Sequence, residues 1–262
     1  MDSAASIPNA VAIAVLLALL VSGLGWWRGW LSGSGFWAAA MVGSAVFAGG
    51  IPLTVGLLFF FFAAGVMGRL IQRHDDSQTS DQHKPRTAAQ VLAVGLCPAA
   101  SAVAYAITQH PVYVMSGLSA LAFATADTWA TDMGMSSDVR PRMLGFGNYV
   151  APGMSGGMTL RGTLGSLMGA TALAGISILS WPLLNVWLAT GMVVIGFGGA
   201  LLDSLLGATV QQRMQCERCG ATTENTEHCG LATKQVYGWL SNSGVNAVCS
   251  WCAGLVGWIW GA

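Results

Sequence analysis

The stretch Phe36 to Gly68, FWAAAMVGSAVFAGGIPLTVGLLFFFFAAGVMG, contains no charged residue over 33 positions. A single helix of this length would be about 50 Å long, whereas the hydrocarbon core of a bilayer is about 30 Å thick. The GGIP sequence at 49–52 lies in its middle and favours a break, because glycine and proline interrupt helices. The stretch therefore predicts two membrane-spanning helices, over about 36–49 and 52–68.

Composition assigns the rest of the chain to the same class. Hydrophobic residues make up 54% of the 262 residues and charged residues only 8%, whereas soluble domains carry roughly 25% charged residues. The apolar composition makes the lipid bilayer the expected partner. The formal net charge is zero, so overall charge indicates no other partner, and we expect no nucleic acid. The length predicts a single integral membrane domain over 1–262.

Hydropathy predicts an all-α fold, a polytopic transmembrane helical bundle of about eight spans within a range of six to nine. Prolines after QH and SW mark two of the turns between spans. The expected spans cover about 10–27, 36–49, 52–68, 88–108, 112–127, 160–180, 183–206 and 243–260.

The distribution of charge predicts an orientation. With eight spans, all eleven lysines and arginines lie on one side of the membrane, and ten of the eleven acids accompany them. The positive-inside rule makes that side cytoplasmic and places both termini outside, in a cytoplasmic (inner) membrane. The first span follows no lysine or arginine, so it is interpreted as a retained helix and not as a signal peptide.

Most residues capable of chemistry fall in three inner segments, 69–87, 128–159 and 207–242. A transporter would more naturally place polar groups at the middle of the bilayer. Here the acids lie at the inner ends of helices. This favours a site at the cytoplasmic membrane face, where a soluble reactant meets a lipid.

Three acids are the candidate metal ligands and catalytic residues: Asp127, Asp132 and Asp203. On a continuous helix Asp132 lies about 140° around from Asp127, although a helix end near Gly134 would let Asp132 turn back. Carboxylates are suitable Mg²⁺ ligands. The alternative is that they are hydrated residues at helix ends, yet acids at membrane depth are costly and usually have a partner.

A glycine-rich loop is the candidate phosphate cradle. Gly153, Gly156 and Gly157 leave backbone N–H groups able to surround an anion, Ser155 adds a hydroxyl, and Arg161 lies at the start of the next helix. The glycines within that helix, at 162, 165 and 169, are better explained by close helix packing.

Further candidates for binding phosphates lie outside this loop. Lys84 and Arg86 end a segment of mixed charge, 73–86, which otherwise has the composition of a solvated loop, and Gln90 follows it. Arg142 lies in the second inner segment and supplies another cation.

Six motifs occur in a characteristic order: QVLAVG (90–95), ADTWATDMG (126–134), SGGMTLRGTLG (155–165), LLDSLLGATVQ (201–211), TEHCG (226–230) and NSGVN (242–246). Over residues 85–260 the chain resembles the membrane family that contains transmembrane protein 19 and phytyl-phosphate kinase. The resemblance implies phosphorylation of an isoprenoid monophosphate to the diphosphate, with CTP or ATP as phosphate donor and Mg²⁺ as cofactor. It also points to Asn242 and Asn246, which flank Ser243, a serine where the family usually has an acid.

Two alternatives from other functional classes stay open. A CTP-dependent cytidylyltransferase would join the nucleotide to the lipid, and a lipid-phosphate or ion transporter would use the same polar residues as a gate. A ladder of charges across the middle of the membrane would support transport, and the sequence contains none.

Cysteines within the 207–242 cytoplasmic loop raise a separate question. Cys216, Cys219, His228 and Cys229 have the ligand types of a tetrahedral zinc site in a small zinc-binding element. Only eight residues separate the two pairs, and ligation by adjacent residues is awkward. Structural zinc, free reduced thiols and a disulfide all remain open, and a reducing cytoplasm disfavours the disulfide.

Overall fold

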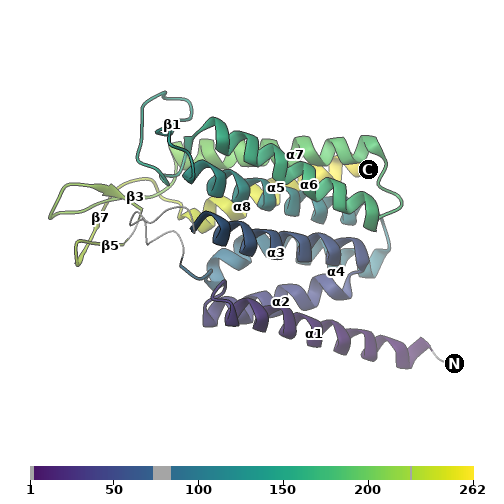
Figure 1. The fold of residues 1–262 in the computed structure, drawn as a ribbon. Coiled ribbons are helices and arrows are strands. Elements are labelled where there is room, and N and C mark those ends of the chain that lie inside the picture. The colour runs from purple at the N-terminus through teal and green to yellow at the C-terminus, as the bar shows by residue number, and fades with distance from the viewer. Residues whose placement is uncertain (1–2, 73–83, 225) are drawn as a thin grey trace.

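The computed structural model describes residues 3–72, 84–224 and 226–262, and within these ranges the chain forms eight helices (Figure 1). Five of them are long and apolar enough to cross a membrane by length and composition, which agrees approximately with the predicted number of spans. The helices are α1 (Ser3–Trp27), α2 (Gly33–Ala48), α3 (Ile51–Gln72), α4 (Ala88–Thr108), α5 (Val112–Met135), α6 (Leu160–Ser180), α7 (Val186–Thr209) and α8 (Asn242–Gly261).

The break at 49–50 lies where the GGIP sequence predicts it. Gly50 adopts a φ of 118°, a backbone conformation that other residues rarely reach. At Gly49 an added Cβ would come within 2.5 Å of Ala102 on α4, so the turn packs closely on its neighbour. Glycine is thus needed here both for the chain reversal and for the close approach.

Helix α5 is the centre of the bundle, in contact with α3, α4, α6, α7 and α8. Every residue from Val114 to Ala126 is buried. The helix continues to Met135, eight residues beyond the predicted end of the span, because Asp127 interrupts the apolar pattern but not the helix. Asp132 therefore stays on the helix and does not turn back toward Asp127.

Glycines on α6 allow it to lie directly against α5. A Cβ at Gly165 would come within 2.6 Å of the Trp129 carbonyl oxygen, and one at Gly169 within 2.8 Å of the Thr125 carbonyl oxygen. These contacts confirm the helix-packing interpretation of the 162–169 glycines. They also fix the position of α5, along its own axis, relative to the loop that precedes α6.

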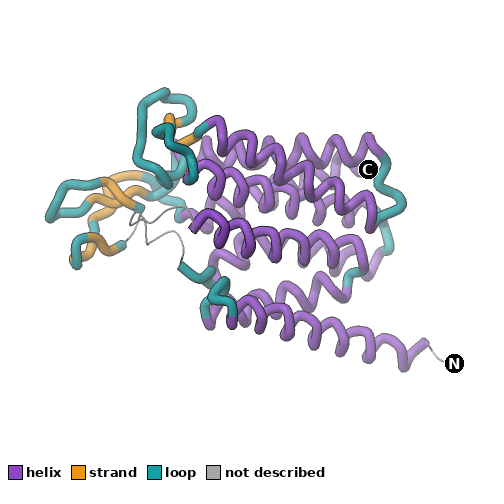
Figure 2. Tube along the Cα trace, in the orientation of Figure 1, coloured by secondary structure: helices purple, strands orange, loops and turns teal. Residues whose placement is uncertain are grey.

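Both termini lie at one end of the bundle, and the long connections lie at the other, as Figure 1 shows. These connections carry short strands that hydropathy did not predict (Figure 2). They form a hairpin β1–β2, a three-stranded sheet in the order β4-β3-β7 and a hairpin β5–β6. Their bounds are β1 (Arg142–Met143), β2 (Gly157–Met158), β3 (Arg213–Gln215), β4 (Thr222–Thr223), β5 (Glu227–His228), β6 (Leu231–Ala232) and β7 (Lys234–Tyr237).

Candidate functional site

Two of the predicted acids converge at the loop end of the bundle. Asp203 on α7 lies close enough to Asp127 on α5 to interact with it electrostatically, and it forms a hydrogen bond with Cys249 on α8. Asn246 lies three residues before Cys249, so it occupies the same face of α8 one turn nearer the loops. Helices α5, α7 and α8 thus contribute to one partly buried polar cluster.

The cation of this cluster is Arg86, which precedes α4. Its backbone is fixed to the α1–α2 connection, because its N–H donates to the Trp30 carbonyl at 2.9 Å and its carbonyl accepts from the Ser32 N–H at 3.0 Å. Burial lowers the pKa of Arg86, while the charges of Asp132 and Asp127 raise it. One guanidinium therefore interacts with both acids of α5, although they point to different sides of the helix.

The Arg86 side chain has two further contacts. It donates to the Thr128 hydroxyl at 3.5 Å, and its guanidinium lies 5.5 Å from the centre of the Phe60 ring. A guanidinium over an aromatic face is stabilised by a cation–π interaction. Arg86 is thus held between a polar helix end and an apolar wall.

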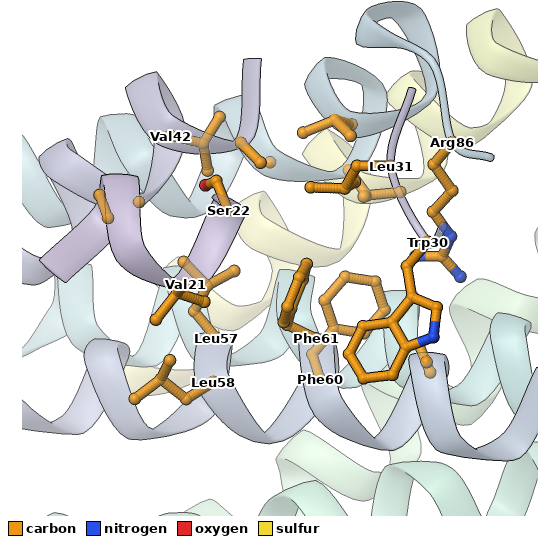
Figure 3. A pocket seen from close by; sticks show the side chains of 18 of the residues that line it. Val21, Ser22, Trp30, Leu31, Val42, Leu57, Leu58, Phe60, Phe61 and Arg86 are labelled. Carbon is orange, nitrogen blue, oxygen red and sulfur yellow. The ribbon is translucent and has the colours of Figure 1, made fainter. Parts of the chain in front are cut away.

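That wall belongs to a cavity of about 180 Å³ between the first four helices and α5 (Figure 3). Apolar side chains such as Val42, Leu57 and Phe61 line most of it. The charged lining residues are Lys84, Arg86 and Asp132. The cavity is apolar along most of its wall and charged at one end. It therefore suits an amphipathic molecule that has an apolar body and a charged end.

The glycine-rich loop carries an anion of the protein itself. The Glu224 carboxylate accepts hydrogen bonds from the Ser155 N–H at 2.8 Å and the Ser155 hydroxyl at 2.9 Å. The buried Gln211 amide donates to both partners, at 2.7 Å to Ser155 and 2.9 Å to Glu224. Glu224 also interacts electrostatically with Asp203, so the loop and the acid cluster are neighbours.

The conformation of this loop depends on its glycines. Gly153 and Gly156 have φ values of 79° and 80°. A Cβ at Gly156 would come within 2.6 Å of the Ala208 backbone nitrogen, so the loop rests on the end of α7. Gly157 begins β2 and pairs with Met143.

Three predicted residues have other partners, and a fourth lies at an exposed helix start. Arg161 donates to the Ser136 carbonyl at 2.7 Å and lies 3.7 Å from the exposed Asp138 carboxylate, so it neutralises the C-terminal end of α5. The other three lie at exposed positions: Arg142 donates to the Tyr149 hydroxyl, Gln90 accepts from Thr87 at the start of α4, and Asn242 begins α8.

The cluster contains oxygens suited to a divalent cation. Asp203 Oδ1 and Asn246 Oδ1 are buried and have no hydrogen-bond partner within the described part of the chain. An unsatisfied buried acceptor is costly unless a ligand satisfies it. Carboxylate and amide oxygens are the donors that Mg²⁺ prefers, so the residues present fit this ion.

The four candidate zinc ligands of the 207–242 loop also lie close together. The side-chain ligand atoms of Cys216, Cys219, His228 and Cys229 all lie within 4.8 Å of one another. Backbone N–H groups of Cys219 and Arg218, together with the His228 side chain, lower the pKa of the Cys216 thiol to about 6. This environment favours the thiolate, which is the metal-binding form.

Sequence reasoning missed Glu224, Gln211 and Cys249 as members of the site. Gln211 ends one of the ordered motifs, LLGATVQ, and that position was a usable signal. Glu224 lies among other polar residues of the cysteine loop, and nothing local distinguishes it. Its contact with Ser155 spans 69 residues of sequence.

Comparison with known proteins identifies the family. The family described as Integral membrane protein DUF92 matches residues 16–254. The chain belongs to this family. This assignment confirms the family resemblance that the ordered motifs indicate, and it makes the bundle an integral membrane protein.

Two relatives are similar over part of their length. An uncharacterized membrane protein of Methanocaldococcus jannaschii is 29% identical over 157 residues, which cover 60% of this chain and 65% of that protein. Protein PGR of Arabidopsis thaliana is 30% identical over 140 residues, which cover 48% of this chain and 47% of that protein. The alignments thus span between about half and two thirds of these relatives. No solved structure matches the chain.

Proposed function

We propose that this protein is a membrane kinase that phosphorylates an isoprenoid monophosphate to the diphosphate, with CTP or another nucleoside triphosphate as donor. The observation that carries the proposal is that Arg86 and Asp132 line the apolar cavity while Arg86 also interacts with Asp127. A lipid phosphate at the charged end of the cavity would therefore lie beside the acid cluster. The resemblance of the six ordered motifs to the family that contains phytyl-phosphate kinase supports the same chemistry.

The cavity suits the part of the lipid nearest its phosphate. Its volume of about 180 Å³ is smaller than the roughly 300–1,000 Å³ of typical small-molecule sites. The first isoprene units would lie between the helices, and the remainder of the tail would lie in the surrounding bilayer. Lys84 and Arg86 would bind the phosphate.

The reaction needs positioning more than proton transfer. An oxygen of the lipid phosphate attacks the γ-phosphorus of the nucleotide, a new P–O bond forms, and the bond from that phosphorus to the β–γ bridging oxygen breaks. The nucleoside diphosphate leaves with the bonding electron pair. The attacking phosphate is already anionic, so charge neutralisation and alignment account for the catalysis.

Asp127, Asp203 and Asn246 would hold Mg²⁺, with Asp132 nearby. The bound ion supplies positive charge that neutralises the phosphates as they approach each other. Arg86 supplies the protein's own cation at the same place. Because Arg161 and Arg142 are engaged at the loop surface, we assign the principal cationic role to Arg86.

The decisive experiment is incubation of the purified protein with a C15–C20 prenyl phosphate, Mg²⁺ and labelled CTP or ATP. A labelled prenyl diphosphate supports the kinase. A CDP-linked lipid would identify a cytidylyltransferase instead. Absence of both products, with uptake of lipid phosphate or ions by vesicles that contain the protein, would identify a transporter.

Filling the cavity should affect the lipid substrate selectively. Gly68 lines the cavity, and an added Cβ there has no described atom within 4 Å. We expect Gly68→Leu to lower kcat/KM for the prenyl phosphate by roughly tenfold, because it occupies space meant for the tail. The KM for the nucleotide should not change. A matched control is Gly175→Leu on the exposed face of α6, and equal activity of the two variants would contradict the cavity assignment.

The proposed orientation can be tested with a membrane-impermeant, mass-shifting thiol reagent on intact bacterial cells that express the protein. Asp138 lies in the connection between α5 and β1, and His110 lies in the turn between α4 and α5, both exposed. These two connections lie at opposite ends of the bundle (Figure 1). We expect Asp138→Cys to react only after permeabilisation and His110→Cys to react in intact cells. Labelling of Asp138→Cys in intact cells would place the acids away from cytoplasmic nucleotide.

A further inference from the structure

We propose that Cys216, Cys219, His228 and Cys229 bind one zinc ion, and that this ion holds in place the segment that delivers Glu224 to the glycine-rich loop. The proposal does not depend on the reaction that the protein catalyses. Soft thiolates and an imidazole select zinc, whereas the carboxylate and amide oxygens of the helix cluster select Mg²⁺. The two sites are therefore chemically distinct.

Three of the distances among the four ligand atoms are close to those of tetrahedral coordination, and all four atoms lie within 4.8 Å of one another. Ligand atoms about 2.0–2.3 Å from a tetrahedral zinc ion are about 3.3–3.8 Å from one another. Cys219 Sγ lies 3.8 Å from Cys229 Sγ and 3.5 Å from His228 Nδ1. His228 Nδ1 lies 3.2 Å from Cys229 Sγ.

The first pair of ligands lies on a tight turn. The Gly220 N–H donates to the Cys216 carbonyl at 2.8 Å, and the Cys216 N–H donates to the Ala221 carbonyl at 2.9 Å. Gly220 has a φ of 71°, which the reversal requires. The turn directs both thiols of the Cys-x-x-Cys sequence toward the hairpin β5–β6.

The second pair of ligands, His228 and Cys229, is adjacent in sequence, and the turn conformation at Cys229 allows both side chains to approach the same point. Cys229 and Gly230 form the two-residue turn between β5 and β6, with φ values of 55° and 74°. Positive φ at both central positions is typical of a type I′ turn. A cysteine in this conformation is unusual and costs energy, and here it brings the Cys229 thiol beside the preceding imidazole. Metal binding provides a compensating gain.

The zinc site surrounds the segment that reaches the candidate active site. Glu224 lies between the two ligand pairs in sequence, and its carboxylate accepts from Ser155 and Gln211. Cys219 and His228 thus fix the chain on both sides of Glu224. Glu224 is a positioning residue for the 153–157 loop, and the zinc ion in turn positions Glu224.

The test measures zinc in the full-length protein purified in detergent from zinc-supplemented cells. We expect about one zinc per chain by elemental analysis, and replacement by cobalt should give the visible absorption of tetrahedral thiolate coordination. Cys219→Ser and Cys229→Ser should each lower zinc content at least about tenfold. The control Cys252→Ser alters an exposed cysteine of α8 and should keep the zinc. Wild-type protein without zinc, or Cys219→Ser with full zinc, would overturn the proposal.

A second pair of measurements separates zinc loss from general unfolding. Helix content by circular dichroism should stay unchanged in Cys219→Ser, because the eight helices do not use the site, while proteolysis within 211–241 should speed up. Glu224→Gln should retain about one zinc per chain, because Glu224 is not a ligand. Equal protease resistance of Cys219→Ser and wild type would show that zinc does not hold this segment.

Discussion

Asp127→Asn is expected to lower turnover of the proposed prenyl-phosphate kinase reaction at least about 100-fold, which corresponds to about 2.7 kcal/mol in the activation barrier. The change keeps the size of the side chain and removes one negative charge. It weakens the attraction for Mg²⁺ and leaves Arg86 facing Asp132 alone. The measurement is steady-state turnover of purified protein at saturating nucleotide and prenyl phosphate.

Asp138→Asn is the matched control for this substitution. Asp138 follows α5, and its side chain is 94% exposed against Arg161, which is 55% exposed. Such an exposed pair contributes little to stability, so this variant should keep nearly full turnover. Asp127→Asn with wild-type activity, in the presence of normal helix content, would remove Asp127 from the site.

Gly165→Val is expected to prevent stable assembly of the bundle. The added side chain would meet the Trp129 carbonyl and the Met133 side chain, at 2.6 Å and 2.8 Å from the new Cβ. Because a backbone carbonyl of the central helix cannot move alone, α6 would separate from α5. We expect a loss of at least about 3 kcal/mol in the free energy of unfolding, at the upper end of overpacking effects. Detergent unfolding followed by circular dichroism measures it.

Gly175→Val tests whether that loss is specific to the contact. Gly175 lies on the same helix at an exposed position, and an added Cβ has no described atom within 4 Å. Both substitutions introduce the same β-branched residue into the same helix, so their helix propensities are matched. Equal unfolding midpoints for the two variants would show that α5 and α6 do not need the close approach.

The bundle could be predicted because a membrane imposes a length and a polarity on every span. The charge-free run of 36–68 required a break, and the structure has it at Gly49–Gly50. The end of α5 could not be predicted in the same way. Hydropathy marks where a helix becomes polar, and α5 continues as a helix for two more turns beyond Asp127.

The part of the candidate site that could be predicted is the part set by how deep each acid lies in the membrane. Asp127 and Asp203 both lie toward the loop ends of their helices, where hydropathy predicts the spans to end, and the structure brings them together. Arg161 is a cation that follows the glycine-rich loop in sequence. In the structure, however, its partners are the Ser136 carbonyl and the Asp138 carboxylate. The contact between Glu224 and Ser155 depends on how the loops cross, which neither periodicity nor hydropathy encodes.

In the proposed kinase, the backbone bridge between Arg86 and the α1–α2 connection would give the first two helices a part in substrate discrimination. Trp30 and Leu31 line the cavity, and the same short segment fixes Arg86 by main-chain hydrogen bonds. A tail that spreads α1 and α2 would move the guanidinium that faces the carboxylates. Lipids of different shape would then differ in how fast they react once bound, so their selectivity would be expressed in kcat more than in affinity.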